Sequence, residues 1–296
     1  MSRDDASDWI PAALLEHAAA FFSKPAFDAD RAIHRDRDDA RRQHALAVIR
    51  EAGTAGIVGI CPLCDAPRHF VSLDSDADVP NLREGLVCDG CGNNARIRAG
   101  LAMLQQLCPD RAAPIYITEQ VSSAYLWLRK RYPATIGSEF APGWWHRMML
   151  SCRLWWRGVI GRVRSEDATR LTLATASQFA VVSFDVLEHV PDYRAALREF
   201  ARVTDAYGWL ILTAPFSGNE RSIERARVLA DGRIEHLHPA EYHGDPLGGG
   251  ALCFHHFGWD LLDDLRAAGY RHAAVVLSWW PEAGLFDGLT TILARR

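Results

Sequence analysis

Two Cys-x-x-Cys pairs constrain the fold of this chain more than any other feature of its sequence. Cys61 and Cys64 form the first pair, and Cys88 and Cys91 form the second. Each pair would sit on a tight turn, and together they supply the tetrahedral four-sulfur shell that zinc prefers. Because protein fills all four positions, such a zinc is structural and closes a ribbon too small to fold by burial alone. The alternatives are free or oxidised thiols, or an iron–sulfur cluster.

Composition limits the remaining classes. The chain has 296 residues, of which 49% are hydrophobic, and its formal net charge is -4. This apolar content excludes wholesale disorder, and the charge excludes a generally nucleic-acid-binding surface. The chain has no apolar run of about 18 residues and its start is acidic, so we expect neither a transmembrane helix nor a secretory signal. Seven cysteines are too few for a disulfide scaffold. We therefore expect a protein of the reducing cytoplasm.

Hydrophobic periodicity predicts three regions: a helical N-terminal region at 1–56, a zinc ribbon at 57–100 and a larger domain at 101–296. In the last region strands alternate with helices, which is typical of an α/β fold with a mostly parallel sheet and helices on both faces. The expected strands are 115–117, 134–137, 159–164, 179–184, 209–213, 273–277 and 289–293, and helices are expected at 193–203 and 259–268.

The segment 184–192, with sequence FDVLEHVPD, resembles the fourth motif of class I S-adenosylmethionine-dependent methyltransferases of the type 11 group. The strand and exit at 208–216 and the segment 255–262 are similar to the same family, so the resemblance covers about 112–296. It implies a Rossmann-like methyltransferase sheet, S-adenosylmethionine as cofactor and a methyl-transfer activity. The ribbon followed by NNARIRA is also similar to a zinc ribbon that precedes this domain in some bacterial members.

The resemblance also implies where the cofactor binds. Glu139, after the second strand, would hydrogen-bond the ribose hydroxyls, and Asp167 would meet the adenine amino group. Asp185 ends the fourth strand and opens the pocket. Such folds bind ligands at the carboxyl ends of the strands. Four neighbours complete the predicted cofactor-binding set: Glu119, Gln120, Phe140 and Val186.

The turn after the first strand departs from the family pattern. It reads ITEQVSS at 117–123, where the family has a Gly-x-Gly turn. A side chain in place of glycine hinders close approach of the backbone to a ligand. This departure motivates a first alternative, a non-catalytic methyltransferase-like binding protein.

Histidines are the candidate bases for removing a proton from a methyl acceptor. His189, expected one turn into the helix beside the pocket, is the first, with a histidine bonded to backbone as its structural alternative. His238 is the second, in the histidine-dense segment 236–245, which is either a lid over the substrate or a solvated surface loop. Asp185, Glu188 and His189 also match a divalent-metal arrangement seen in certain O-methyltransferases that use magnesium. A fourth ligand would come from His236, His238, His255 or His256.

Arginine and tryptophan are concentrated at 143–164, a segment without any acidic residue. Three interpretations are open: a buried or oligomer-facing segment, a membrane-surface docking segment, or a site for an anionic glycan, nucleotide-linked or single-stranded nucleic-acid ligand. Arg96 and Arg98, after the second cysteine pair, either hold the ribbon in place or contact an anionic substrate.

The favoured function is S-adenosylmethionine-dependent methyl transfer to a small-molecule or glycan-type acceptor. Beside the non-catalytic alternative, a second alternative is an RNA methyltransferase that uses the ribbon for recognition. The net charge of -4 disfavours nucleic acid as the partner.

Overall fold

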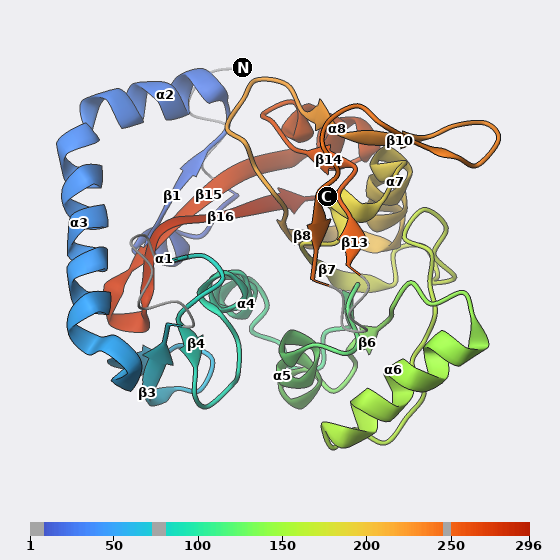
Figure 1. Ribbon diagram of the computed structural model, residues 1–296, viewed down its shortest axis with the longest axis horizontal. Helices are drawn as coiled ribbons and strands as arrows, with labels where there is room; N and C mark the ends of the chain where they lie inside the picture. Colours follow the sequence, from blue (N-terminus) through green and yellow to red (C-terminus); the bar gives the residue numbers. More distant parts are fainter. Residues whose placement is uncertain (1–8, 73–80, 245–249) are drawn as a thin grey trace. The chain divides into compact units, whose positions relative to one another are not determined.

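The computed structural model describes residues 9–72, 81–244 and 250–296 (Figure 1). The chain divides into two compact units. One comprises Met1–Asp110 with Ala274–Ile292, and the other comprises Arg111–Ala273 with Leu293–Arg296. The three-part division into 1–56, 57–100 and 101–296 remains a prediction.

The second unit is built on four parallel strands: β5 (Ile115–Ile117), β6 (Ile136–Gly137), β7 (Gln178–Phe184) and β8 (Thr204–Thr213). They pair in the order β8-β7-β5-β6. β7 is almost entirely apolar and buried, as expected for a central parallel strand. After β5 the chain forms β6 on one side and later β7 on the other. The strand order therefore reverses beside β5, which is where folds of this type bind ligands.

Two helices of this unit begin at side-chain caps. Ser122 caps α5 (Ser123–Arg131), and Asp192 caps α7 (Tyr193–Val203). The apolar face of α7 packs on β8 and on α8 (Leu261–Ala268), which ends at the left-handed Gly269. A further helix, α6 (Trp144–Trp156), carries the tryptophans of the sequence segment 143–164.

Two long strands, β15 (His272–Trp280) and β16 (Leu285–Arg295), follow α8. The turn between them contains the short helix η4 (Pro281–Ala283). Within the first unit, β15 pairs antiparallel with the N-terminal strand β1 (Ala18–Phe21). The expectation of an α/β fold that combines parallel strands with helices is therefore confirmed for the second unit.

Between β8 and α8 the chain forms short two-stranded sheets instead of further helices. The pairs are β10 with β11, β12 with β13, and β14 with β9, all antiparallel. Their bounds are β9 (Ile223–Glu224), β10 (Ala226–Val228), β11 (Ile234–His236), β12 (Tyr242–His243), β13 (Ala251–Leu252) and β14 (His255–His256). The glycines at 248–249 lie outside the described residues.

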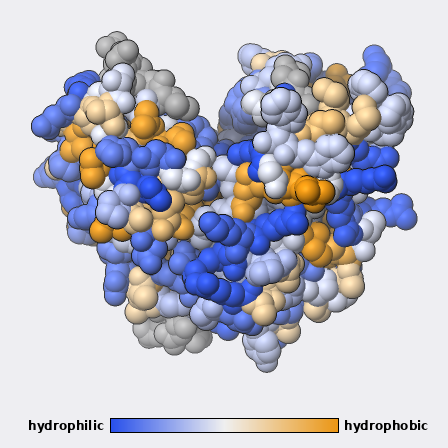
Figure 2. All heavy atoms as spheres, turned by 90° about the horizontal axis from the view of Figure 1, so that it is seen from below, coloured by the Kyte–Doolittle hydropathy of each residue, from blue (hydrophilic) through white to orange (hydrophobic). Residues whose placement is uncertain are grey.

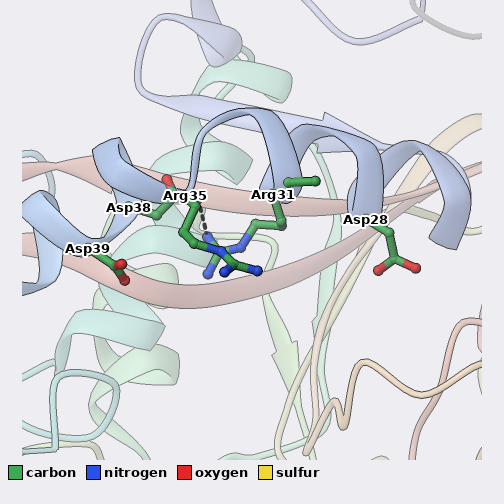
Figure 3. Close-up of a pocket in the computed structure, with 6 residues that line it drawn as sticks. Asp28, Arg31, Arg35, Asp38 and Asp39 are labelled. Carbon is green, nitrogen blue, oxygen red and sulfur yellow. Dashed lines mark ion pairs between the residues drawn. The ribbon is translucent and has the colours of Figure 1, made fainter.

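The first unit opens with α1 (Ala12–Leu15), β1 (Ala18–Phe21), α2 (Lys24–Ile33), α3 (Arg35–Ala52) and the short η2 (Gly53–Ala55). Aspartates and arginines line a hollow on α2 and α3, with Arg31 and Arg35 between Asp28 and the pair Asp38 and Asp39 in the sequence (Figure 3). The Arg31 guanidinium lies 2.9 Å from the buried carboxylate of Asp38. These charges thus partly neutralise each other within the chain.

The ribbon region is an antiparallel three-stranded sheet followed by a helix. Its strands are β2 (Ile57–Cys61), β3 (Ala66–Val71) and β4 (Val87–Cys88). Asn94 caps the following α4 (Ala95–Leu107), most of whose side chains are buried. The cysteines at 61 and 88 therefore lie at strand ends, next to the turns that carry the second cysteine of each pair.

Two expectations about secondary structure were wrong. The N-terminal region is not purely helical, because Ala18–Phe21 pairs antiparallel with residues Val275–Ser278. Long-range strand pairing overrides local helical periodicity there. The strand expected at 159–164 is absent from the described chain. Instead, the backbone N–H groups of Val163 and Arg164 donate to side chains, Ser151 Oγ at 2.9 Å and Gln120 Oε1 at 2.7 Å.

Candidate functional site

The candidate ligand site lies at the carboxyl ends of β5, β6 and β7, beside the reversal of strand order. Three segments begin there: 118–122 after β5, 138–140 after β6, and 185–186 after β7. Six of the seven predicted cofactor-binding residues lie in these segments, and only Asp167 lies elsewhere. The parallel pairing of the three strands brings the segments to one edge of the sheet.

Glu139 joins two of these segments. Its Oε1 accepts a hydrogen bond of 2.7 Å from the backbone N–H of Val121, in the turn after β5. The backbone of Glu139 also pairs with Ser165 in an isolated parallel bridge. The adjacent ring of Phe140 is 68% exposed. The edge therefore presents a carboxylate and an accessible aromatic ring side by side.

The turn after β5 holds its shape without glycine. None of residues 118–123 has a positive φ, so this backbone path strains no side chain. Gln120 is buried, and its amide donates to Arg162 O at 3.3 Å and accepts from Arg164 N at 2.7 Å. Glu119 is half-buried, and its backbone O accepts from the Ser122 hydroxyl. Gln120 thus fills space inside the protein and positions the turn.

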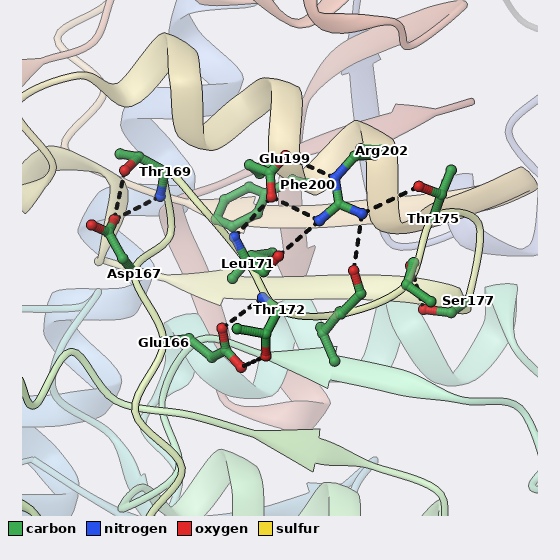
Figure 4. Close-up of polar contacts among 12 residues, drawn as sticks. Glu166, Asp167, Thr169, Leu171, Thr172, Thr175, Ser177, Glu199, Phe200 and Arg202 are labelled. Carbon is green, nitrogen blue, oxygen red and sulfur yellow. Dashed lines mark hydrogen bonds and ion pairs between the residues drawn. The ribbon is translucent and has the colours of Figure 1, made fainter.

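Asp167 lies on an exposed turn. Its Oδ1 accepts from the backbone N–H and the hydroxyl of Thr169, at 2.9 and 2.7 Å (Figure 4). Its neighbour Glu166 is the buried acid, and accepts from Arg164 Nε and from the N–H and hydroxyl of Thr172. Hydrogen bonds to Thr172 and Arg164 keep the pKa of Glu166 low although burial alone would raise it.

Asp185 adopts a left-handed conformation with φ 50° directly after β7. Aspartate tolerates this region better than most residues, and such outliers concentrate at functional sites. Its Oδ1 accepts from the Thr213 hydroxyl at 3.0 Å, and its N–H donates to Thr213 O. Val186 follows and is half-exposed. These bonds fix the point where the chain leaves the sheet.

His189 lies in the short helix η3 (Leu187–His189) and not on the helix expected for it. Pro191 and the cap residue Asp192 delay the start of α7 to Tyr193. The Nδ1 atom of His189 lies 2.8 Å from Leu252 O, which makes it the N–H donor and leaves Nε2 as an acceptor. Bonding to backbone, the structural alternative, is thus present at one nitrogen.

The second predicted base, His238, is exposed just after β11, and its backbone N–H donates to Arg225 O. The structure records no side-chain contact between His189 and His238 among the residues that it describes. It places His243 beside His189 instead, with ring centroids 5.0 Å apart. His243 is not among the residues predicted from the sequence, because a histidine-dense segment does not show which ring turns inward.

Glu188, His189 and His243 form a cluster whose ligand atoms lie within 4.8 Å of one another. Glu188 is completely buried. Its carboxylate, with help from Glu241, raises the pKa of His243 to about 9 against the opposing effect of burial. Without a metal, His243 would therefore be protonated at neutral pH.

The four ribbon cysteines form a second cluster within 4.8 Å, in the first unit. The Sγ atoms of Cys61 and Cys91 lie 3.9 Å apart, as do those of Cys64 and Cys88. Four sulfurs at about 2.3 Å from one tetrahedral zinc lie about 3.8 Å from each other. The spacing therefore fits a single zinc and is too long for disulfides.

Both arginines after the ribbon have structural partners. Arg98 is fully buried, and its guanidinium donates to the backbone O atoms of Leu86, Asn93, Ala283 and Gly284. It also lies 4.2 Å from the ring centre of Phe70. Arg96 pairs with Glu84 at 2.9 Å. The alternative of contact with an anionic substrate is therefore wrong for the buried Arg98.

The helix α6 is exposed on an apolar and aromatic face. Only Leu150, Ser151 and Leu154 of this helix are buried. The exposed large side chains follow helical spacing: Trp144, Trp145, Met148, Met149, Trp155 and Trp156. Figure 2 views the molecule from below, the side on which α6 lies in Figure 1, and shows hydrophobic patches among strongly hydrophilic groups. Within its own unit, the described residues leave these side chains exposed.

A family model and several solved structures are similar to parts of this chain. The family model described as a methyltransferase domain matches residues 127–212, less than half of the chain. No curated protein matches the chain significantly. No helix among the described residues is long and apolar enough to cross a membrane.

Several solved structures are similar at low identity. An S-adenosylmethionine-dependent methyltransferase from Mesorhizobium loti is 17% identical, with a TM-score of 0.45, over 70% of this chain and 100% of its own. A sugar N-methyltransferase from Streptoalloteichus is 16% identical, with a TM-score of 0.47, over 68% and 87%. A Burkholderia thailandensis N1-methyltransferase with bound S-adenosylhomocysteine is 17% identical, with a TM-score of 0.41, over 68% and 78%.

Proposed function

We propose that this chain is an enzyme that transfers a methyl group from S-adenosylmethionine to a small-molecule or glycan-type acceptor. The single observation that carries the proposal is the placement of Glu139. Its carboxylate lies at the carboxyl edge of a parallel sheet, beside the reversal of strand order, and bonds the turn after β5. The match of residues 127–212 to a methyltransferase domain supports the same reaction class.

The residues at this edge suit a nucleoside with an attached amino acid. The Glu139 carboxylate would accept hydrogen bonds from ribose hydroxyls, and the exposed Phe140 ring would lie against adenine. Asp167 would accept from the adenine amino group. Glu119, Gln120, Asp185 and Val186 would line the rest of the site, with Gln120 acting through the turn it holds. The cofactor supplies an electrophilic methyl group bound to sulfonium.

His189 is the proposed base. Because Nδ1 donates to Leu252 O, the lone pair on Nε2 is available to accept a proton from an acceptor hydroxyl or amine. His238 remains a second candidate, in the exposed segment proposed to cover the acceptor. The protein otherwise contributes by positioning the acceptor in line with the methyl group.

Isothermal titration calorimetry with S-adenosylhomocysteine tests the proposal. Glu139→Ala should weaken binding about ten- to a hundredfold, since it removes a charge-assisted contact worth about 1.5–3 kcal/mol. Glu139→Gln keeps an acceptor for Val121 N–H, so it separates loss of charge from loss of the turn. Glu220→Ala, an exposed acid, is the matched control. A wild type that binds neither S-adenosylmethionine nor S-adenosylhomocysteine at millimolar concentration would refute the proposal.

A zinc ion held by Cys61, Cys64, Cys88 and Cys91 is proposed as a structural element. The sulfur–sulfur distances of 3.9 Å support it. A non-catalytic binding protein remains the first alternative function, because the turn after β5 lacks the glycines of the family. That alternative requires cofactor binding without turnover of any acceptor.

A further inference from the structure

Glu188 is an unusual carboxylate. Its side chain is 0% exposed, and neither of its oxygens accepts a hydrogen bond from any residue in the described part of the chain. A buried carboxylate without compensation is costly, so such a group is normally paired, protonated or bound to a metal. The arrangement of the groups around Glu188 indicates which of these applies.

Two imidazoles face this carboxylate through one nitrogen each. His243 Nδ1 lies 3.5 Å and His189 Nε2 lies 3.8 Å from the same oxygen, Glu188 Oε1. The opposite nitrogen of each ring already has an acceptor: Leu252 O for His189 at 2.8 Å, and Glu241 Oε1 for His243 at 2.9 Å. Donation outward from each ring leaves two lone pairs that point toward an anionic oxygen. That arrangement is repulsive unless a proton or a metal ion lies between the rings and the carboxylate.

Outer acceptors of this kind are typical of metal-bound histidines, because they fix the tautomer and the orientation of the ring. Glu241 is itself held in place by His256 at 3.1 Å and by Arg225 at 3.1 Å. The Leu252 carbonyl and the Glu241 carboxylate thus bind the ring nitrogens that face away from Glu188.

The distances also fit an ion. Nitrogen and oxygen ligands at about 2.0–2.2 Å from a tetrahedral zinc lie about 3.3–3.6 Å from one another. The observed 3.5 and 3.8 Å are close to these values and long for hydrogen bonds. The histidine side chains are 18% and 28% exposed, so an ion could enter and keep a solvent-facing position.

Backbone hydrogen bonds fix the positions of the segments that carry these three residues. Phe254 N–H donates to Glu188 O, and Cys253 N–H donates to Glu241 O. His243 pairs with Ala251 in the β12–β13 ladder. The segment 251–254 therefore connects both halves of the cluster, and the site does not depend on long free side chains.

We propose that Glu188, His189 and His243 bind a divalent transition-metal ion, with at least one coordination position open to water or to an oxygen of a ligand. With the ion bound, His189 Nε2 is a ligand and no longer a base, so His238 is then the candidate base for the proposed methyl transfer. Two imidazoles and one carboxylate favour zinc, iron or manganese over magnesium, which prefers all-oxygen shells. This set differs from the one suggested by sequence spacing. Asp185 bonds Thr213, His255 lies 3.0 Å from Pro191 O, and His256 supports Glu241.

Metal stoichiometry tests this site independently of methyl transfer. The full chain is saturated with zinc, passed through gel filtration and analysed by elemental mass spectrometry. Glu188→Gln and His243→Ala should each lose one zinc per chain relative to wild type. His236→Ala, an exposed histidine of the same segment, should lose none. Because the readout is a difference of one equivalent, it does not depend on the occupancy of the cysteine cluster.

Because Glu188 is buried, metal loss in Glu188→Gln alone would not distinguish a missing ligand from misfolding. His243→Ala makes this distinction, since the His243 side chain is half-exposed. Cobalt substitution provides a second readout. Cobalt at the proposed site should give visible d–d absorption that disappears in His243→Ala, while thiolate charge-transfer bands from the cysteine cluster persist. Equal metal content and equal spectra in wild type and both variants would overturn the proposal. A proton shared between His243 and Glu188 would then occupy the place of the ion.

Discussion

Arg98 places a positive charge where the chain excludes water entirely. It donates to four backbone carbonyls, two of them at 283 and 284, which are remote in sequence but belong to the same unit. Arg98→Met would leave these acceptors without a donor, so we expect a loss of about 3–5 kcal/mol in unfolding free energy. Urea denaturation followed by circular dichroism measures this loss. Arg111→Met, on an exposed residue, should change stability by less than about 0.5 kcal/mol.

Glu199 stabilises the turn-rich segment that carries Asp167. It accepts from Arg202 through both oxygens and from Leu171 N–H at 2.8 Å, as Figure 4 shows. The hydrogen bonds from Arg202 lower the pKa of Glu199 in the folded chain. The stabilisation is therefore complete above the unfolded value of about 4.3 and is lost as pH falls through the folded pKa.

Glu199→Gln should accordingly destabilise the protein by about 1–3 kcal/mol at pH 7. The difference from wild type should narrow steadily as denaturation curves are repeated toward pH 3.5. If the difference in unfolding free energy between wild type and variant stayed constant across this pH range, the charge on Glu199 would contribute nothing to stability. Asp263→Asn is the control, because Asp263 also pairs with an arginine but is 81% exposed. This variant should change the unfolding free energy little at either pH.

At the scale of single elements, α6 has an exposed stripe of tryptophan and methionine on a helix without acidic residues. Interfacial tryptophan with flanking arginine is typical of helices that lie on anionic lipid. We expect the protein to sediment with phosphatidylglycerol vesicles at low salt and to be released at high salt. Replacing Trp155 and Trp156 by serine should abolish this sedimentation, while Tyr207→Ser, a 71% exposed aromatic residue, should not.

If the protein stayed in the supernatant with vesicles at low salt, lipid docking would be contradicted. Analytical ultracentrifugation would then decide whether a second copy of the chain covers the same stripe, which is the oligomeric interpretation. In that case the double serine variant should be monomeric where the wild type is not.

Elements with strong local signals were predictable from the sequence, and those fixed by distant partners were not. The apolar run of β7 and the capped α7 were predicted within one residue, because continuous burial and an Asp192 cap are local features. Residues 18–21 form a strand only because β15 pairs with them. Residues 159–164 fail to form one because Ser151 and Gln120 take their backbone donors.

The candidate site also contains some residues whose placement the sequence predicts and others whose placement depends on distant partners. The edge that carries Glu139 and Asp185 follows from where strands end, which the sequence shows. The inward turn of His243 depends on its pairing with Ala251 and on the placement of Glu241, which only the fold defines. The four-cysteine cluster was predictable because each Cys-x-x-Cys pair is set by its own turn.

At the scale of the whole molecule, the two compact units should respond differently to loss of zinc. All four cysteines belong to the unit built from Met1–Asp110 and Ala274–Ile292. Zinc binding to such a shell supplies about 10–16 kcal/mol of apparent folding energy in zinc-finger peptides, which a three-stranded ribbon cannot replace by burial. Chelation should therefore unfold the ribbon and release the carbonyls that Arg98 binds.

Hydrogen exchange before and after chelation measures this effect segment by segment. Amide protection should fall in β2, β3, β4 and the first turn of α4, and should persist in β7 and α7. Cys88→Ser should cause the same loss of amide protection even with metal present, because Cys88 is a fully buried member of the cluster. Cys152→Ser, on half-exposed α6, should leave the pattern unchanged. If the metal-free wild type kept its protection in β2–β4, the cysteines would not need zinc to hold the ribbon. The fold of that unit would then rest on Arg98 and its carbonyl partners alone.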